Sequence, residues 1–153
     1  TRIGEVYKWM ETEIPILMLS SINKLLKNPS DVEKQSTNPK DALRTYPRNP
    51  SDGKIDWNND VKKILRLINA SSEPFSGAYT LYDGKKVIIW RSSLYEDDEN
   101  YMAVPGQIAR LDKKSGNIIV ITGKGKIQIE EIEIERKREK PIFFIHSIRK
   151  RFK

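Results

Sequence analysis

The stretch DGKIDWNNDVKKILRLINASSEPFSGAYTLYDGKKVIIW, residues 52–90, changes its hydrophobic period part-way along and so decides the fold class. Within residues 58–69 the apolar positions recur at helical spacing, whereas AYTLY (78–82) and KKVIIW (85–90) are short strand-like runs. Asp83-Gly84 between those runs is a hairpin turn signal. The stretch therefore predicts a helix followed by the first hairpin of a sheet.

Further strand-like runs follow downstream, separated by tight turns: PGQIARLD (105–112), NIIVIT (117–122) and KIQIEEIEI (126–134). In the last run Ile127 and Ile129 share one face. Ile132 and Ile134 are out of phase with them, and a β-bulge near Glu130 would restore a single face. Five short strands with tight turns predict a small closed or nearly closed β-barrel of the OB kind.

The segment upstream is predicted to begin with helix and to continue as an extended connection. Apolar residues within 5–27 lie three and four positions apart, which predicts two short helices that break near Glu11. Pro15 would then lie in the first turn of the second helix, where its missing N–H matters little. Residues 30–54 show little periodicity, with at most one turn of helix near Asp41, and indicate a linker or strap.

These patterns together predict an α+β protein with three parts. Residues 1–54 hold N-terminal helices and the extended strap, and residues 55–136 hold one helix and the OB-like barrel. Residues 137–153 are expected to form a basic C-terminal tail, since ERKREK and SIRKRFK concentrate positive charge there.

The overall charge and composition narrow the class of protein. The net charge of +7 favours an anionic partner such as a nucleic acid or a nucleotide, although a general solubility bias explains it equally well. The chain has no cysteine, which excludes disulfides and thiol catalysis. It also lacks an initiator Met and a signal-peptide pattern, so we expect a fragment of a cytoplasmic protein.

No motif in the chain indicates a reaction centre. The lone His146 lies in an aromatic and basic setting and is interpreted as structural. The carboxylates of EDDEN (96–100) are typical of a solvated loop, and GKGK (123–126) is typical of a β-turn because no helix follows it. We therefore predict no catalytic residue and no metal site in these 153 residues.

Several motifs occur here in a characteristic order: IDW (55–57), EPFSGAY (73–79), VIIW (87–90), VPGQI (104–108) and ITGKGKIQIEEI (121–132). This order and spacing resembles the C-terminal region of the folate-dependent formyltransferases. That family includes methionyl-tRNA formyltransferase and the sugar-nucleotide N-formyltransferases. The resemblance covers most of the chain, with Ser76 standing where the family usually has Pro.

The resemblance implies an activity that this chain cannot perform alone. In the family an Asn, a His and an Asp catalyse formyl transfer from 10-formyltetrahydrofolate to an amine, in an N-terminal domain that also binds the folate. The first two belong to an N-x-H motif, which this chain lacks, so we predict that it is inactive by itself. The form Arg-x-Pro-x-Asp-Gly (48–53) favours a nucleotide-linked amino sugar as acceptor, with methionyl-tRNA as the alternative.

Three residues are predicted to line the substrate cleft: Arg48, Asp52 and Trp57. The alternative is structural, with Asp56 capping the helix that follows and Trp57 packing that helix on the barrel. Two other functions remain open from the residues alone. One is a free-standing OB-like nucleic-acid-binding module, and the other is a dimerisation module, since a homodimer is compatible with the sequence.

Overall fold

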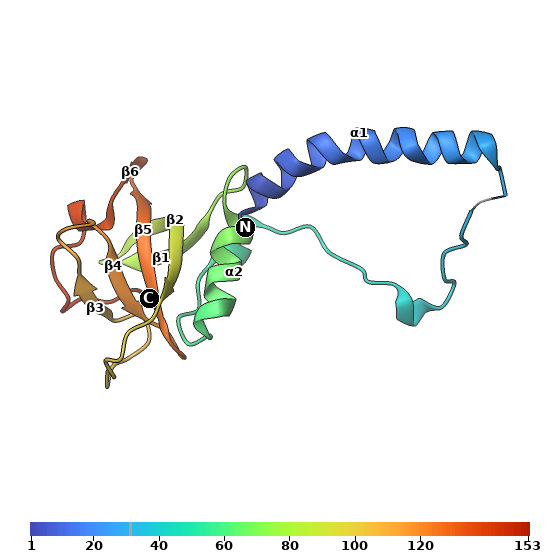
Figure 1. The fold of residues 1–153 in the computed structure, drawn as a ribbon. Helices are drawn as coiled ribbons and strands as arrows, with labels where there is room; N and C mark the ends of the chain where they lie inside the picture. The colour runs from blue at the N-terminus through green and yellow to red at the C-terminus, as the bar shows by residue number, and fades with distance from the viewer. Residues whose placement is uncertain (31) are drawn as a thin grey trace. The chain divides into compact units, whose positions relative to one another are not determined.

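The computed structural model describes residues 1–30 and 32–153 and confirms the α+β class. Two compact units make up the chain, one comprising Gly4–Arg48 and the other Thr1–Ile3 with Asn49–Lys153. The elements in chain order are α1 (Ile3–Lys27), η1 (Pro39–Asp41), η2 (Pro50–Gly53), α2 (Val61–Ser71), β1 (Ala78–Tyr82), β2 (Lys85–Tyr95), β3 (Ile108–Leu111), β4 (Ile118–Ile121), β5 (Lys126–Ile134), β6 (Lys137–Glu139) and η3 (Pro141–Phe143) (Figure 1).

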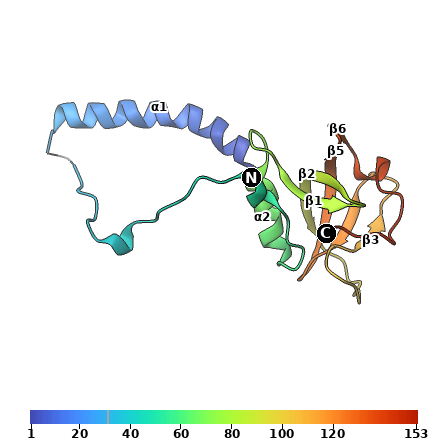
Figure 2. The same ribbon diagram turned by 180° about the vertical axis from the view of Figure 1, so that it is seen from behind.

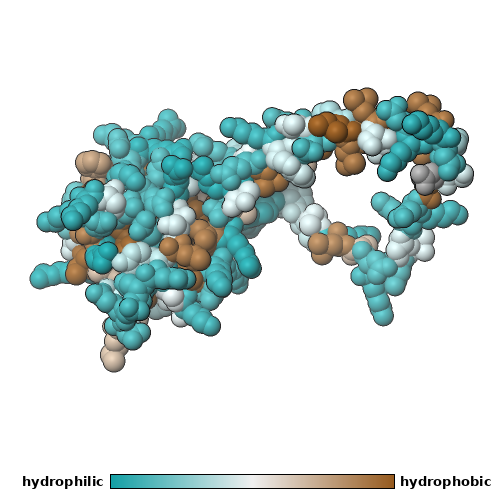
Figure 3. Space-filling view, viewed as in Figure 1, coloured by the Kyte–Doolittle hydropathy of each residue, from teal (hydrophilic) through white to brown (hydrophobic). Residues whose placement is uncertain are grey.

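The prediction of two short N-terminal helices is wrong, because α1 runs without a break from Ile3 to Lys27. Pro15 lies inside it. A proline removes one backbone hydrogen bond, and the good helix formers on either side carry the helix through that defect. No residue of α1 is buried, and large apolar side chains such as Leu17 and Leu26 are exposed along it (Figure 3). The turn expected near Asp41 is confirmed as η1.

Helix α2 begins later than the sequence predicts. Its N-cap is Asp60, whose carboxylate accepts the backbone N–H of Lys62 at 2.8 Å. The residues before it are occupied by a tight turn in which Asn59 donates its backbone N–H to the carbonyl of Asp56. Its inner face buries Ile64 and Ile68 against the sheet, and α2 lies beside β1 and β2 (Figures 1 and 2).

The strands form one antiparallel sheet of order β1-β2-β5-β4-β3, with β6 paired to β5. The predicted bulge is confirmed, because Arg91 of β2 faces Glu131 while the next residue faces Ile129, so Glu130 is left over. All four isoleucines of β5 are consequently buried. The hairpin between β1 and β2 turns at Gly84, where φ is +79°, as a two-residue turn requires.

The predicted closure of the barrel is not confirmed, because the hydrogen-bonded sheet is open between β1 and β3. The last residues of the chain lie at that gap instead. Lys153 exchanges both backbone hydrogen bonds with Leu81 of β1, at 2.9 and 3.0 Å. Phe152 donates its backbone N–H to the carbonyl of Gly106, just before β3, at 2.9 Å. The exposed edges that an open sheet would leave are therefore partly covered.

Residues 137–153, expected as a basic tail, also contribute to the core. They form β6 and η3, and they bury Ile145 and Phe152 at 0% and 1% exposure. The Phe152 ring stacks on Trp57 with 5.3 Å between centroids and an interplanar angle of 13°. Gly106 makes the approach possible, because a Cβ there would lie 2.5 Å from the Phe152 carbonyl oxygen. No helix in the described residues is long and apolar enough to cross a membrane.

Removing the Phe152 ring should destabilise the fold strongly. We expect Phe152→Ala to lower the free energy of unfolding by about 3–5 kcal/mol, since it opens a cavity in the core and abolishes the Trp57 stack. Urea denaturation followed by circular dichroism measures this. Phe143→Ala is the matched control, because Phe143 is 65% exposed and its loss should change stability by no more than about 0.5 kcal/mol. Equal losses in the two variants would contradict the role of Phe152.

Candidate functional site

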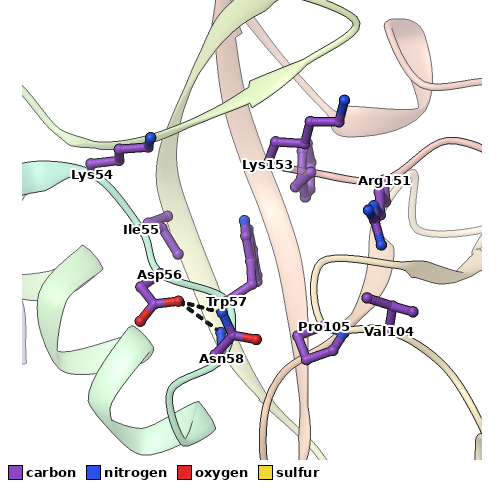
Figure 4. Close-up of a pocket in the computed structure, with 10 residues that line it drawn as sticks. Lys54, Ile55, Asp56, Trp57, Asn58, Val104, Pro105, Arg151 and Lys153 are labelled. Carbon is purple, nitrogen blue, oxygen red and sulfur yellow. Dashed lines mark hydrogen bonds between the residues drawn. The ribbon is translucent and has the colours of Figure 1, made fainter.

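A cleft of about 500 Å³ opens on the surface of the larger unit, where the end of the strap meets the end of the chain. One side consists of residues 54–58, and the other consists of residues 104–105 and 151–153 (Figure 4). Its position follows from the backbone pairing described above. Ile55 donates its N–H to the carbonyl of Tyr79 in β1, at 2.8 Å, and Lys153 pairs with Leu81 of the same strand. Strand β1 therefore holds both sides of the cleft.

Trp57 forms the inner wall of this cleft and is 4% exposed. Its indole Nε1–H donates to the Thr80 hydroxyl at 2.9 Å, and that hydroxyl donates to the carbonyl oxygen of Lys153 at 2.9 Å. The ring is stacked on Phe152. Trp57 thus ties the strap, β1 and the chain end together, and its ring is occupied by packing.

Asp56 lies beside Trp57 but does not cap α2, contrary to the structural interpretation of the sequence. Its carboxylate accepts the backbone N–H of Asn58 at 3.0 Å and the side-chain amides of Asn58 and Asn59 at 2.9 and 3.1 Å. These hydrogen bonds, first of all the one from the Asn58 backbone, lower the pKa of Asp56 below its ordinary value. Asp56 therefore shapes the turn that leads from the strap into α2.

Basic side chains surround the opening of the cleft. Lys54, Arg151 and Lys153 are exposed and line it, and within residues 1–30 and 32–153 none of them has a salt-bridge partner. Their backbones are nonetheless held, since Lys54 forms a bridge with Tyr79 and Arg151 forms one with Gln107. The arrangement places uncompensated positive charge at a fixed hollow.

The structure does not assemble the three predicted substrate-binding residues in one place. Trp57 lines the cleft. Asp52 is exposed in η2, where its carboxylate accepts the backbone N–H of Asn49 at 2.7 Å, and it is not among the lining residues. Arg48 belongs to the other compact unit. A role of Arg48, Asp52 and Trp57 in substrate binding stays a prediction.

The basic lining residues were not singled out from the sequence, although a signal exists. Arg151-Phe152-Lys153 alternates charged, apolar and charged positions, the period of a strand with one face inward. The structure shows that pattern, with Phe152 buried and its two neighbours exposed. Three residues are too few for a periodicity argument, so the segment was interpreted only as part of a basic tail.

The other titratable clusters do not form a reaction centre in the described part of the chain. His146 is exposed, and the described residues contain no group of three metal-ligating side chains. Asp97 of the EDDEN loop is not solvated as expected but forms an ion pair with Lys126, and only 19% of its side chain is exposed. That pair holds the loop to the start of β5.

Comparison with known proteins decides the family. A family model described as "Formyl transferase, C-terminal domain" matches residues 48–144, which is most of the chain. The chain belongs to this formyl transferase C-terminal domain family. The match contains α2, every strand and the strap residues from Arg48 onward, so it covers the fold that builds the cleft.

Curated formyltransferases are among the relatives of this C-terminal domain. Methionyl-tRNA formyltransferase of Alkaliphilus oremlandii is 37% identical over 86 residues, which is 56% of this chain and 26% of that protein. The enzyme of the same name from Coxiella burnetii is 28% identical over 80% of this chain and 37% of its own length. Bifunctional polymyxin resistance protein ArnA of Wigglesworthia glossinidia brevipalpis is 37% identical over 53% of this chain and 11% of its own length.

Solved structures support the fold of the domain. One variant of HypX from Aquifex aeolicus has a TM-score of 0.64 at 19% identity, covering 97% of this chain and 26% of that one. A HypX structure in complex with tetrahydrofolic acid has a TM-score of 0.56 at 18% identity, covering 86% of this chain and 23% of that one. The chain therefore spans about a quarter to a third of the length of most of the proteins compared here.

The hydrogen bond of the Trp57 indole can be tested separately from its packing. We expect Trp57→Phe to lower the free energy of unfolding by about 1–3 kcal/mol, since it leaves the buried Thr80 hydroxyl without a donor and removes part of a buried ring. The control is Trp9→Phe, because Trp9 is 63% exposed and is not part of the cleft. Urea midpoints of the two variants measure the difference, and equal midpoints would show that the Trp57 bond does not hold the cleft.

The turn at Asp56 should depend on pH in a defined direction. Its pKa is lowered in the folded state, so the stabilisation is complete above the pKa of an unfolded aspartate, about 3.9, and is lost as the pH falls through the lower folded value. Carboxyl chemical shifts from an NMR titration report the midpoint for Asp56. A midpoint at or above that of an unfolded aspartate would refute the hydrogen-bonded turn.

Proposed function

We propose that this chain is the C-terminal region of a 10-formyltetrahydrofolate-dependent formyltransferase and that it positions the amine acceptor. The observation that carries the proposal is the family match over residues 48–144, together with a cleft built by those residues and the chain end. Holding an acceptor at a defined distance and angle contributes much of the rate of a transfer reaction. The catalytic Asn, His and Asp then belong to a part of the enzyme outside these residues.

The exposed surface of α1 supports a larger parent enzyme. Helix α1 is apolar on nearly all sides in its second half, with Ile14, Ile16, Leu17, Met18 and Leu19 all exposed. A helix of that composition is normally buried. We assign α1 to the end of the catalytic domain and residues 28–54 to the strap that follows it, and the division of the chain at residues 54 and 136 remains part of this proposal.

The cleft does not fit the folate itself. A pterin ring needs an open slot beside an aromatic or apolar wall, but Trp57 and Phe152 are stacked on each other and are 4% and 1% exposed. We therefore place 10-formyltetrahydrofolate in the catalytic domain. Within this chain the residues of the cleft can hold and orient the acceptor, and no step of the transfer is assigned to them.

The acceptor that we propose is an amine on a nucleotide-linked sugar, favoured by the strap sequence Arg-x-Pro-x-Asp-Gly at residues 48–53. Methionyl-tRNA is the second candidate. It is favoured by the names of relatives that are 37% and 28% identical to this chain. Both acceptors carry phosphate, which matches the basic rim of the cleft.

Assaying the full-length protein tests this function. Formyl transfer from 10-formyltetrahydrofolate should be measured to a panel of nucleotide-linked amino sugars and to methionyl-tRNA, with the 153-residue chain alone as control. We expect transfer to one acceptor by the full-length protein and none by the chain alone. Transfer to no acceptor in the presence of the complete protein would overturn the proposal.

A further inference from the structure

The rim of the cleft is more positive than its own lining can neutralise. Lys54, Arg151 and Lys153 contribute positive charge, and Asp56 is the one carboxylate that lines the cleft in the described structure. The Asp56 oxygens already accept hydrogen bonds from Asn58 and Asn59. An anion entering the cleft would therefore meet cations that have no salt-bridge partner among the residues described.

These cations are held in place before any ligand arrives. The Lys54 N–H donates to the carbonyl of Ser51 at 3.1 Å, and Lys54 also bridges to Tyr79. On the opposite side the backbone of Lys153 is fixed by its two hydrogen bonds to β1. Free surface lysines lose conformational entropy when they bind, and fixing their backbones reduces that loss. The rim thus differs from a solvated charge run on a mobile tail.

The interior of the cleft selects phosphate over bases. Sequence-tolerant binding of single strands relies on exposed aromatic rings on which bases stack. Here Trp57 and Phe152 stack on each other, and both are almost fully buried. What remains accessible to a ligand is cationic side chain, which contacts phosphate irrespective of the base attached. Lys and Arg are also the side chains that bind phosphate best.

We propose that this cleft is a phosphate-binding subsite, in which Lys54, Arg151 and Lys153 hold the phosphate groups of the formyl acceptor. The assignment to an acceptor rests on the proposed function, whereas the affinity for phosphate does not. The chemistry is shared by the pyrophosphate of a nucleotide-linked sugar and by the phosphodiesters of a tRNA. Binding of either is expected to be independent of base identity and to weaken with salt.

The test is a binding measurement on the 153-residue chain with defined probes. Fluorescence anisotropy with labelled unfractionated tRNA, and calorimetry with uridine diphosphate, inorganic pyrophosphate and uridine, cover both sources of phosphate. The rim variant is Lys54→Gln/Arg151→Gln/Lys153→Gln. The control is Lys62→Gln/Lys113→Gln/Lys114→Gln, which removes the same charge from exposed positions that do not line the cleft. Equal urea midpoints confirm that all variants fold.

We expect the rim variant, and not the control, to bind its phosphate probe roughly tenfold or more weakly. With tRNA, the slope of log affinity against log salt should fall by roughly 2–3, since each lost phosphate contact contributes about 0.7–0.9. Binding of tRNA alone assigns the subsite to a polynucleotide. Binding of uridine diphosphate and pyrophosphate assigns it to a nucleotide-linked acceptor.

Three results would overturn the phosphate subsite: no binding of any phosphate probe, equal losses in the rim and control variants, or uridine binding as tightly as uridine diphosphate. The formyl transfer assay fails independently of these. Rim-dependent phosphate binding by a protein whose complete form transfers no formyl group would remove the proposed function and leave the subsite standing. Transfer without rim-dependent binding would do the reverse.

Discussion

The contact between Trp57 and Phe152 is the constraint on which the rest of the larger unit depends. It joins the end of the strap to the end of the chain across a centroid distance of 5.3 Å, and the hydrogen bonds through Thr80 attach both to β1. Without it the open edge of the sheet would lose its cover, and the two sides of the cleft would no longer be fixed to one strand. A single stacked pair therefore serves packing, edge protection and the placement of the basic rim.

Much of the fold was accessible from the sequence because its signals are local. The strands AYTLY and KIQIEEIEI, the Asp83-Gly84 turn and the bulge at Glu130 follow from period and turn chemistry, and the structure has them. The start of α2 was misplaced because Asn58, Asn59 and Asp60 are all good capping residues, and only the turn around Asp56 decides among them. The unbroken α1 was missed because one proline was given too much weight.

The site was harder to predict because it depends on contacts between residues far apart in sequence. Trp57 was identified, but nothing local shows that Phe152 stacks on it or that Arg151 and Lys153 then face the same hollow as Lys54. The fold explains this division of labour. A scaffold of isoleucines with a basic cleft and no reaction centre among the described residues supplies position and charge, and the chemistry that we propose for the parent enzyme comes from another domain.

The most direct test of the central claim, that the strap and the chain end form one ligand cleft, is an NMR titration of the chain with inorganic pyrophosphate, followed through the backbone amides and the Trp57 indole N–H. The account predicts chemical shift changes concentrated in residues 54–58, 104–106 and 151–153, with the indole signal moving together with them. Changes confined to other basic segments, such as β6 or the lysines of the β3–β4 turn, would contradict it.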